Sequence, residues 1–213
     1  MTRRVGILLS GRGSNMAALL HAARAPGYPA TIGLVLSNQP SAPGIALAAE
    51  AGVATAVIDH RRFGKDRAAH EAVIDAALRQ AGVEIVCLAG YMRLLTPFLV
   101  TAWQGRMLNV HPSLLPAFPG LHTHARALEA GVTLHGCTVH LVTETMDEGP
   151  ILAQAAVPVV PGDTEDSLAA RVLVQEHRIY PAALAAFAAG QPGIAAPADA
   201  ALANPLPGRA EVE

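Results

Sequence analysis

Between residues 4 and 111 the sequence alternates short apolar runs with segments of helical character, and this alternation restricts the possible folds more than any other feature. The expected strands are 4–10, 31–37, 55–59, 84–90 and 106–111, and the expected helices are 14–24, 44–52, 66–82 and 96–103. Strands buried on both faces have nearly continuous apolar sequences, and helices between them serve as crossovers. The alternation therefore predicts a parallel sheet with helices on both faces.

The pattern changes after residue 120. A short helix is expected over 123–131, two strands at 135–143 and 150–159 alternate like antiparallel partners, and a last helix runs from 163 to about 187. From Gly190 onward the chain is rich in Pro, Ala and Gly, which is typical of a flexible tail. We expect one α/β domain over 1–189, doubly wound, mostly parallel and Rossmann-like, with an antiparallel C-terminal edge, followed by a tail over 190–213.

Composition excludes several classes of protein. The formal net charge is -2 and 15% of the residues are charged, which argues against a general binder of nucleic acid. No run reaches the roughly 18 apolar residues of a membrane span. The N-terminal MTRRVGILLSG is better explained as a first strand than as a signal peptide, and Cys87 and Cys137 lack C-x-x-C spacing. We expect a cytoplasmic protein with reduced cysteines and no membrane partner.

The loop SGRGSN (10–15) joins the first strand to the first helix. Glycines allow close approach of the backbone, and a helix N-terminus favours anions. A dinucleotide fingerprint would need a third glycine where Met16 stands, and a Walker loop would need a lysine. Two interpretations remain: a tight turn with Ser14 as the helix N-cap, or a site for one monophosphate at Gly13, Ser14 and Asn15.

Asn109 and His111 lie at the carboxyl end of the fifth expected strand, where open α/β sheets bind ligands. Alternation along a strand places both side chains on one face. An Asn amide can donate to an oxygen that gains negative charge, and a His can transfer a proton near neutral pH. The pair suits acyl transfer, with three prolines up to residue 119 stiffening the loop. The alternative is that both side chains only satisfy backbone groups.

A carboxylate beside His111 would favour the protonated imidazole or orient a water molecule. Asp147, in the loop TETMDEGP (143–150), is the candidate, and Glu144 and Glu148 compete with it. All three could equally be ordinary loop acids. The sequence pattern alone does not show which of the three acids lies beside His111.

Two further groups of residues have two explanations each. Met92 to Leu95 follow the fourth strand, so they either flank a planar ligand or pack in the core with Arg93 exposed. His122 and His124 have the spacing of metal ligands, but no third ligand accompanies them at a recognisable spacing. We expect no metal.

Five stretches occur in the order seen in phosphoribosylglycinamide formyltransferases, and the chain resembles that family from about residue 4 to 188: SGRGSN, AGYMRLLTP, NVHPSLLPAFPGLHTH, HGCTVHLVTETMDEGPIL and QEHRIYP. HPSLLP is shared by the wider superfamily that uses 10-formyltetrahydrofolate. PGLHTH is narrower, because methionyl-tRNA formyltransferases resemble R-G-A-x-P there. Formyltetrahydrofolate hydrolases carry an additional N-terminal regulatory domain.

The resemblance implies a formyltransferase fold and an enzyme of purine biosynthesis that moves a formyl group from 10-formyltetrahydrofolate to the amine of glycinamide ribonucleotide. It implies that Asn109 polarises the formyl group, that His111 donates a proton and that Asp147 keeps His111 protonated. Gly13, Ser14 and Asn15 would hold the substrate phosphate, and Glu176 its ribose or amine end. The folate pocket would be lined by Arg67, Met92, Arg93, Leu94, Leu95, Asn109, Thr143, Glu144, Thr145, Met146 and Asp147.

One position departs from the family pattern: Leu173 stands where a polar Gln or Lys is common. The expected partners are small molecules only, and the chain would be a monomer or a homodimer. Three rival functions remain: a formyltetrahydrofolate hydrolase, a non-catalytic nucleotide-binding module and a metalloenzyme.

Overall fold

The computed structural model describes residues 2–191, and these divide into two compact units. The first unit comprises residues 2–109 and 142–144, and the second comprises 110–141 and 145–191. No helix within residues 2–191 has the length and apolar character needed to cross a membrane.

The strands of the first unit are parallel. They are β1 (Arg3–Leu9), β2 (Ala30–Ser37), β3 (Thr55–Val57), β4 (Ile85–Leu88) and β5 (Met107–His111), whose last two residues belong to the second unit. β1 pairs with β2 and β4, β2 with β3, and β4 with β5. The sheet as a whole has the order β3-β2-β1-β4-β5-β6-β7, with β6 and β7 contributed by the second unit. The predicted doubly wound, mostly parallel α/β fold is confirmed.

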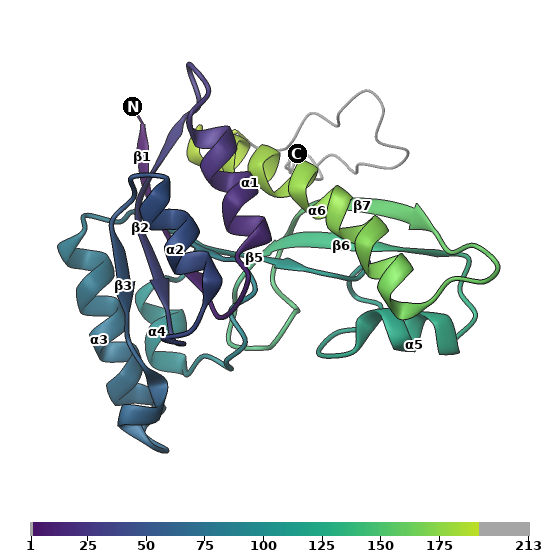
Figure 1. Ribbon diagram of the computed structural model, residues 1–213, viewed down its shortest axis with the longest axis horizontal. Helices are drawn as coiled ribbons and strands as arrows, with labels where there is room; N and C mark the ends of the chain where they lie inside the picture. Colours follow the sequence, from purple (N-terminus) through teal and green to yellow (C-terminus); the bar gives the residue numbers. More distant parts are fainter. Residues whose placement is uncertain (1, 192–213) are drawn as a thin grey trace, which may run out of the picture. The chain divides into compact units, whose positions relative to one another are not determined.

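Four helices and one short 3₁₀ helix connect these strands: α1 (Ser14–Ala23), α2 (Pro43–Glu50), η1 (His60–Phe63), α3 (Arg67–Gln80) and α4 (Pro97–Ala102). Because βαβ crossovers are right-handed, the reversal of strand order at β1 places α1 and α2 on one face and α3 and α4 on the other. In agreement, α1 packs against α2 and α3 against α4 (Figure 1).

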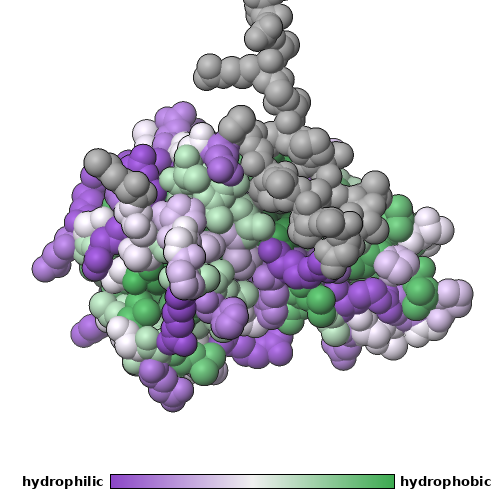
Figure 2. All heavy atoms as spheres, turned by 90° about the horizontal axis from the view of Figure 1, so that it is seen from above, coloured by the Kyte–Doolittle hydropathy of each residue, from purple (hydrophilic) through white to green (hydrophobic). Residues whose placement is uncertain are grey.

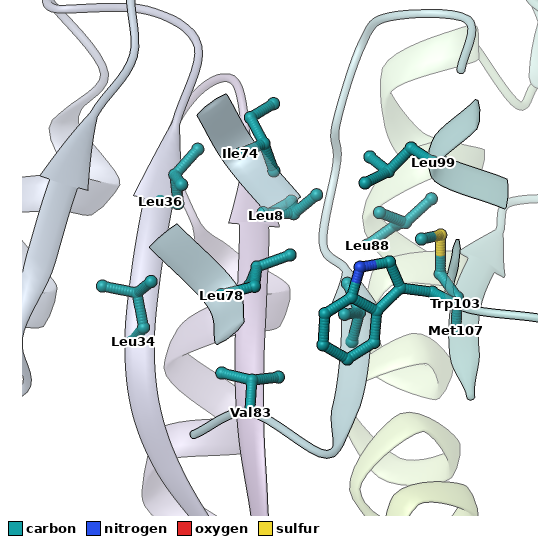
Figure 3. Packing of buried hydrophobic residues seen from close by; sticks show 11 residues of the cluster. Leu8, Leu34, Leu36, Ile74, Leu78, Val83, Leu88, Leu99, Trp103 and Met107 are labelled. Atoms are coloured by element: carbon teal, nitrogen blue, oxygen red, sulfur yellow. The ribbon is translucent and has the colours of Figure 1, made fainter. Parts of the chain in front are cut away.

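The face under α3 and α4 carries a continuous hydrophobic core (Figure 3). Alternate residues of the strands point toward it, since successive side chains of a strand face opposite ways. The cluster consists of Leu8, Leu34, Leu36, Ile74, Leu78, Val83, Val86, Leu88, Leu99, Trp103 and Met107. Trp103 is 1% exposed and its indole N–H donates to Asp75 at 2.9 Å, so its polar group is also satisfied. This packing makes a rigid base for the loops that leave the carboxyl ends of β1 and β4.

The second unit contains β6 (Leu134–Leu141), β7 (Ile151–Pro158), α5 (Thr123–Glu129) and α6 (Glu165–Ala188). β6 and β7 are antiparallel, as predicted, and α6 packs on both. Thr164 caps α6 in a reciprocal capping box with Ser167. These contacts give the unit its own core.

A buried hydroxyl holds the proline-rich loop to β6. Thr138 is fully buried and donates to the Ser113 carbonyl at 2.7 Å, while it accepts the Leu115 N–H at 3.0 Å. Gln154 donates to the Leu115 carbonyl at 2.8 Å and to Thr138 at 3.0 Å. The prolines therefore act together with a hydrogen-bond network in fixing the loop that follows His111.

The expected elements all occur, with shifted ends, and the sequence did not indicate η1. The prediction of Ser14 as an N-cap is wrong. The N-cap of α1 is Gly13, with no side-chain cap, and Ser14 is the first helical residue. The predicted tail lies almost entirely outside the described residues.

Hydrophilic and hydrophobic side chains are interspersed on the face of the molecule drawn in Figure 2. The exposed large hydrophobic residues include Met92 and Leu94, at 67% and 61% exposure. Both follow β4 at its carboxyl end. Isolated apolar residues are common on the surfaces of folded proteins. These two differ because they lie at the end of the sheet where open α/β folds bind ligands.

Candidate active site

In the loop after β1, Gly13 is packed too closely to be replaced by a residue with a side chain. Gly13 has φ 77°, and a Cβ there would lie 2.9 Å from the Cα of Gly44 and 2.9 Å from the Met16 side chain. The Gly44 N–H donates to the Gly11 carbonyl at 3.1 Å, which joins the loop to the start of α2. Gly44 was not singled out in the sequence, because its role depends on a contact with a distant loop.

The same loop offers an anion the first turn of α1. The first N–H groups of a helix lie beyond the reach of its own carbonyls and, with the helix dipole, favour negative charge. Ser14 and Asn15 begin the helix, Asn15 is 9% exposed, and the first turn contains no acidic residue. This geometry can hold one phosphate group at Gly13, Ser14 and Asn15.

The segment after β4, residues 90–96, exposes part of its apolar side chains. Tyr91 and Leu95 pack against the core cluster, whereas Met92 and Leu94 are exposed and Arg93 is partly buried. Burial of two side chains holds the segment on the unit while two others remain available to a ligand. Of the two explanations that the sequence offers for Met92 to Leu95, core packing applies to Leu95. The exposed side chains of Met92 and Leu94 fit contact with a ligand instead.

His111 ends β5 and is 6% exposed. Its Nε2 lies 3.1 Å from the Phe118 carbonyl oxygen, and its Nδ1 lies 3.5 Å from Oδ2 of Asp147. A carbonyl oxygen only accepts hydrogen bonds, so Nε2 carries a proton. The other ring nitrogen, Nδ1, faces the carboxylate of Asp147.

Asp147 is the acid of its loop that reaches His111. Its side chain is 7% exposed, and Oδ2 accepts the Gly120 N–H at 2.8 Å. Its backbone has φ 59°, a conformation that Asp tolerates better than most residues. Glu144 and Glu148 are exposed, and Glu144 accepts a 3.4 Å hydrogen bond from Thr101 in the first unit. Position in the structure therefore separates three acids that the sequence left equal.

His140 is a neighbour of this pair that sequence reasoning missed. It is 2% exposed, and its Nε2 lies 3.7 Å from Oδ1 of Asp147. Its Nδ1 lies 2.9 Å from the Leu141 carbonyl oxygen. Burial lowers the pKa of His140, against the opposing effects of that backbone contact and of Asp147. Asp147 therefore lies between two buried histidines, His111 and His140. Only the alternation of β6 could have indicated this side chain, and alternation alone names no partner.

Asn109 precedes His111 by two residues in β5 and is partly buried, on the same face of the strand. Arg67 is the first residue of α3 and is exposed. Thr143 and Glu144 are exposed residues of the first unit, and Thr145 and Met146 are exposed residues of the second.

Glu176 lies on α6 and is 7% exposed. It is close enough to Cys137 of β6 to act on that thiol: burial, and then the charge of Glu176, raises the pKa of Cys137 far above its usual range. Leu173, one turn earlier on α6, is partly buried. The carboxylate of Glu176 is thus held inside the second unit rather than displayed on its surface.

The histidines of the PGLHTH stretch have different environments. His122 is exposed with φ 57°, and His124 hydrogen-bonds through Nδ1 to Nε2 of His135 at 3.1 Å. The rings of His135 and Phe118 also pack in a T-shaped arrangement, with ring centroids 5.9 Å apart. His124 therefore has a histidine partner from β6 rather than His122.

Fold and site together define a doubly wound α/β protein with a histidine–carboxylate pair at the end of a parallel strand. The formyl transferase family model matches residues 3–184, and the chain belongs to the formyl transferase family.

Several relatives are similar over most of the chain. Phosphoribosylglycinamide formyltransferase of Escherichia coli (strain K12) is 44% identical over 185 residues, which cover 87% of this chain and 87% of that protein. The crystal structure of phosphoribosylglycinamide formyltransferase from Brucella melitensis has 58% sequence identity and a TM-score of 0.84, covering 92% of this chain and 100% of that one. The human trifunctional purine biosynthetic protein adenosine-3 is 48% identical over 187 residues, 88% of this chain, and the chain spans only 18% of its length.

Proposed function

We propose that the protein transfers the formyl group of 10-formyltetrahydrofolate to the amine of glycinamide ribonucleotide, giving formylglycinamide ribonucleotide and tetrahydrofolate in purine biosynthesis. The observation that carries the proposal is the set of relatives named phosphoribosylglycinamide formyltransferase at 44% and 58% identity over most of the chain. The domain that performs the reaction is residues 1–189.

In the proposed reaction the substrate amine attacks the formyl carbon. A new C–N bond forms as the bond to the folate nitrogen breaks, the amine loses one proton and the folate nitrogen gains one. Asn109 donates a hydrogen bond to the formyl oxygen as it becomes negative, and His111 is the proton donor to the leaving nitrogen. Asp147, 3.5 Å from Nδ1 of His111, favours the protonated ring.

The remaining roles are binding roles. Gly13, Ser14 and Asn15 would hold the phosphate of the nucleotide, and Glu176 its ribose or amine end. The residues in contact with the folate would be Arg67, Met92, Arg93, Leu94, Leu95, Asn109, Thr143, Glu144, Thr145, Met146 and Asp147. The exposed apolar side chains of Met92 and Leu94 support contact with an apolar ring system.

Hydrolysis of the formyl donor is the reaction that the same residues would perform with water in place of the amine. The relatives support transfer and not hydrolysis, since they are named for the ribonucleotide acceptor. A helix N-terminus suited to phosphate also supports it, because water requires no phosphate anchor. We further propose a cytoplasmic enzyme without metal, acting on small molecules as a monomer or a homodimer.

The test is formyl transfer by the purified protein, with 10-formyltetrahydrofolate consumption and product formation measured with and without glycinamide ribonucleotide. We expect consumption that requires the amine and yields the formylated nucleotide. Consumption without the amine would instead indicate the hydrolase. A folded sample that consumes no donor in either mixture would favour the binding module.

A further inference from the structure

We propose that Ser10 and Glu71 are positioning residues that fix the two ends of segment 90–96 and so prepare its middle for the folate. The proposal rests on the proposed function, since it assigns that segment to folate binding. Both residues belong to the first unit, and neither is among the candidate substrate contacts.

Ser10 fixes the beginning of the segment. Its hydroxyl oxygen accepts the Met92 N–H at 2.8 Å, and its own N–H donates to the Gly90 carbonyl at 3.1 Å. The hydroxyl proton is donated to Oδ1 of Asn38 at 2.6 Å. Because that proton is used by Asn38, the lone pairs of the oxygen are left to face Met92.

Asn38 is itself held in place. It follows β2, is 1% exposed, and its carbonyl oxygen lies 2.9 Å from Nδ1 of His60. Its side-chain Nδ2 lies 3.3 Å from the same ring nitrogen. The orientation of the Ser10 hydroxyl is therefore set by a buried amide at the end of the neighbouring strand.

Glu71 fixes the end of the segment. It lies on α3, is 3% exposed, and one carboxylate oxygen accepts the Thr96 N–H at 2.8 Å. The other oxygen accepts the Thr96 hydroxyl. Thr96 is the N-cap of α4 but makes no side-chain cap, so its hydroxyl serves Glu71 instead. Hydrogen bonds to a carboxylate are stronger than neutral ones, particularly when buried.

Between these two attachments side-chain packing restrains the segment only in part, through Tyr91 and Leu95. Gly90 has φ 71°, and the side chains of Met92 and Leu94 are mostly exposed and contribute little packing. A loop that must be ordered by its ligand binds more weakly, because ordering costs conformational entropy. The two attachments order the backbone beforehand, so that the exposed side chains and main-chain groups between them are already placed.

The experiment measures binding of tetrahydrofolate and, separately, of glycinamide ribonucleotide by calorimetry, together with the melting temperature. The variants are Ser10→Ala and Glu71→Ala. Ser10→Thr keeps the hydroxyl, Glu71→Gln keeps an acceptor for the Thr96 N–H, and Ser41→Ala removes an exposed serine hydroxyl as a matched control. Steady-state KM and kcat for the folate are measured on the same samples.

We expect the Kd for tetrahydrofolate to rise about 3- to 10-fold in Ser10→Ala and roughly 10-fold in Glu71→Ala. Ser10→Ala removes one neutral hydrogen bond to the segment, and Glu71→Ala removes two charge-assisted ones. The folate KM should rise with little change in kcat. Affinity for the nucleotide should be unchanged in Glu71→Ala. Glu71→Gln and Ser10→Thr should recover most of the folate affinity, and Ser41→Ala should match wild type.

Two results would overturn the proposal while leaving the proposed function intact: folate affinity equal to wild type in both alanine variants, or an equal loss of affinity for both ligands in Glu71→Ala. If Glu71→Ala does not fold, the two Ser10 variants decide: a folate affinity of Ser10→Ala equal to that of Ser10→Thr and of wild type again overturns the proposal. A wild-type protein that binds no tetrahydrofolate would overturn the proposed function, and the positioning role with it.

Discussion

The two compact units contain different kinds of candidate functional groups. In the first unit the candidate ligand-binding elements are main-chain features: a glycine loop, a helix N-terminus and a segment held by hydrogen bonds to its N–H groups. In the second unit the decisive groups are ionisable side chains, with His111 3.5 Å from Asp147 and His140 on the other side of that carboxylate.

This difference predicts different sensitivities to mutation. A main-chain site fails when a Cβ is added where none fits or when a supporting hydrogen bond is lost. A site made of ionisable side chains fails when a single functional group is removed, even though the fold is kept. The predictions below test that contrast, beginning with the largest effect.

Substitution of His111 should have the greatest effect on turnover. We expect His111→Ala, and likewise Asn109→Ala, to lower turnover roughly 10²–10⁴-fold while the protein remains folded, because proton transfer and stabilisation of the oxyanion are lost. Stopped assays of formyl transfer measure this, with circular dichroism as a check on folding. His21→Ala, which removes an exposed histidine of α1, should retain wild-type turnover. Wild-type rates in both site variants would reject the site.

The carboxylate beside His111 should control the pH dependence of turnover. Asp147→Asn preserves shape and suits the left-handed backbone at this position, φ 59°. Without the negative charge the imidazolium is less favoured, so the ring loses its proton at lower pH and the basic limb of the kcat profile should move to lower pH. We also expect kcat to fall about tenfold or more.

The matched control is Glu148→Gln, since Glu148 is an exposed acid one residue away. Its profile should coincide with that of the wild type. A basic limb that stays in place in Asp147→Asn would show that the carboxylate does not act through His111.

The glycine loop gives the corresponding test in the first unit. Gly13→Ala puts a Cβ 2.9 Å from the Cα of Gly44 at a residue with φ 77°. We expect about 1–3 kcal/mol of lost stability and a raised KM for the ribonucleotide, with kcat for bound substrate nearly unchanged. In Gly11→Ala the added Cβ has no neighbour within 4 Å, so it should behave as wild type. Equal effects of the two substitutions would contradict a role for close packing.

The sequence predicts the fold better than it predicts the environments of single residues. Strands such as β2 and helices such as α3 follow from apolar periodicity, which extends over whole elements. Asp66 caps α3 by accepting the Ala69 N–H at 2.9 Å, and Asp is a residue type that favours this position. Ser14 illustrates a local signal that fails, since an apparent cap gives way to Gly13 when the preceding loop needs a left-handed residue.

Within the candidate site, the sequence could predict only which residues close together along the chain share a face. Asn109 and His111 share a strand, so their common face follows from alternation. The selection of Asp147 over Glu144 and Glu148, the presence of His140, and the supports at Ser10 and Glu71 all depend on contacts between distant segments. Periodicity and spacing contain no information on such contacts, and the family resemblance indicated only the first of them.

The smallest expected effect concerns His135, a buried histidine of the second unit. Burial, then the neighbouring His124, lowers the pKa of His135 from 6.5 to about 4, and His111 acts in the same direction. Between pH 4 and 6.5 the unfolded chain thus binds a proton at this position that the folded chain does not. Stability should therefore rise with pH across that window and be lost as the pH falls through it.

Replacement of His135 by glutamine removes the titration and keeps a hydrogen-bonding group toward His124, whose Nδ1 lies 3.1 Å away. Urea unfolding at pH 7.5 and pH 5 should show a loss of stability on acidification that is about 1–2 kcal/mol smaller in His135→Gln than in wild type. His21→Gln, at an exposed position, should lose as much as wild type. Equal losses in all three proteins would mean that His135 binds its proton as readily in the folded state as in the unfolded one.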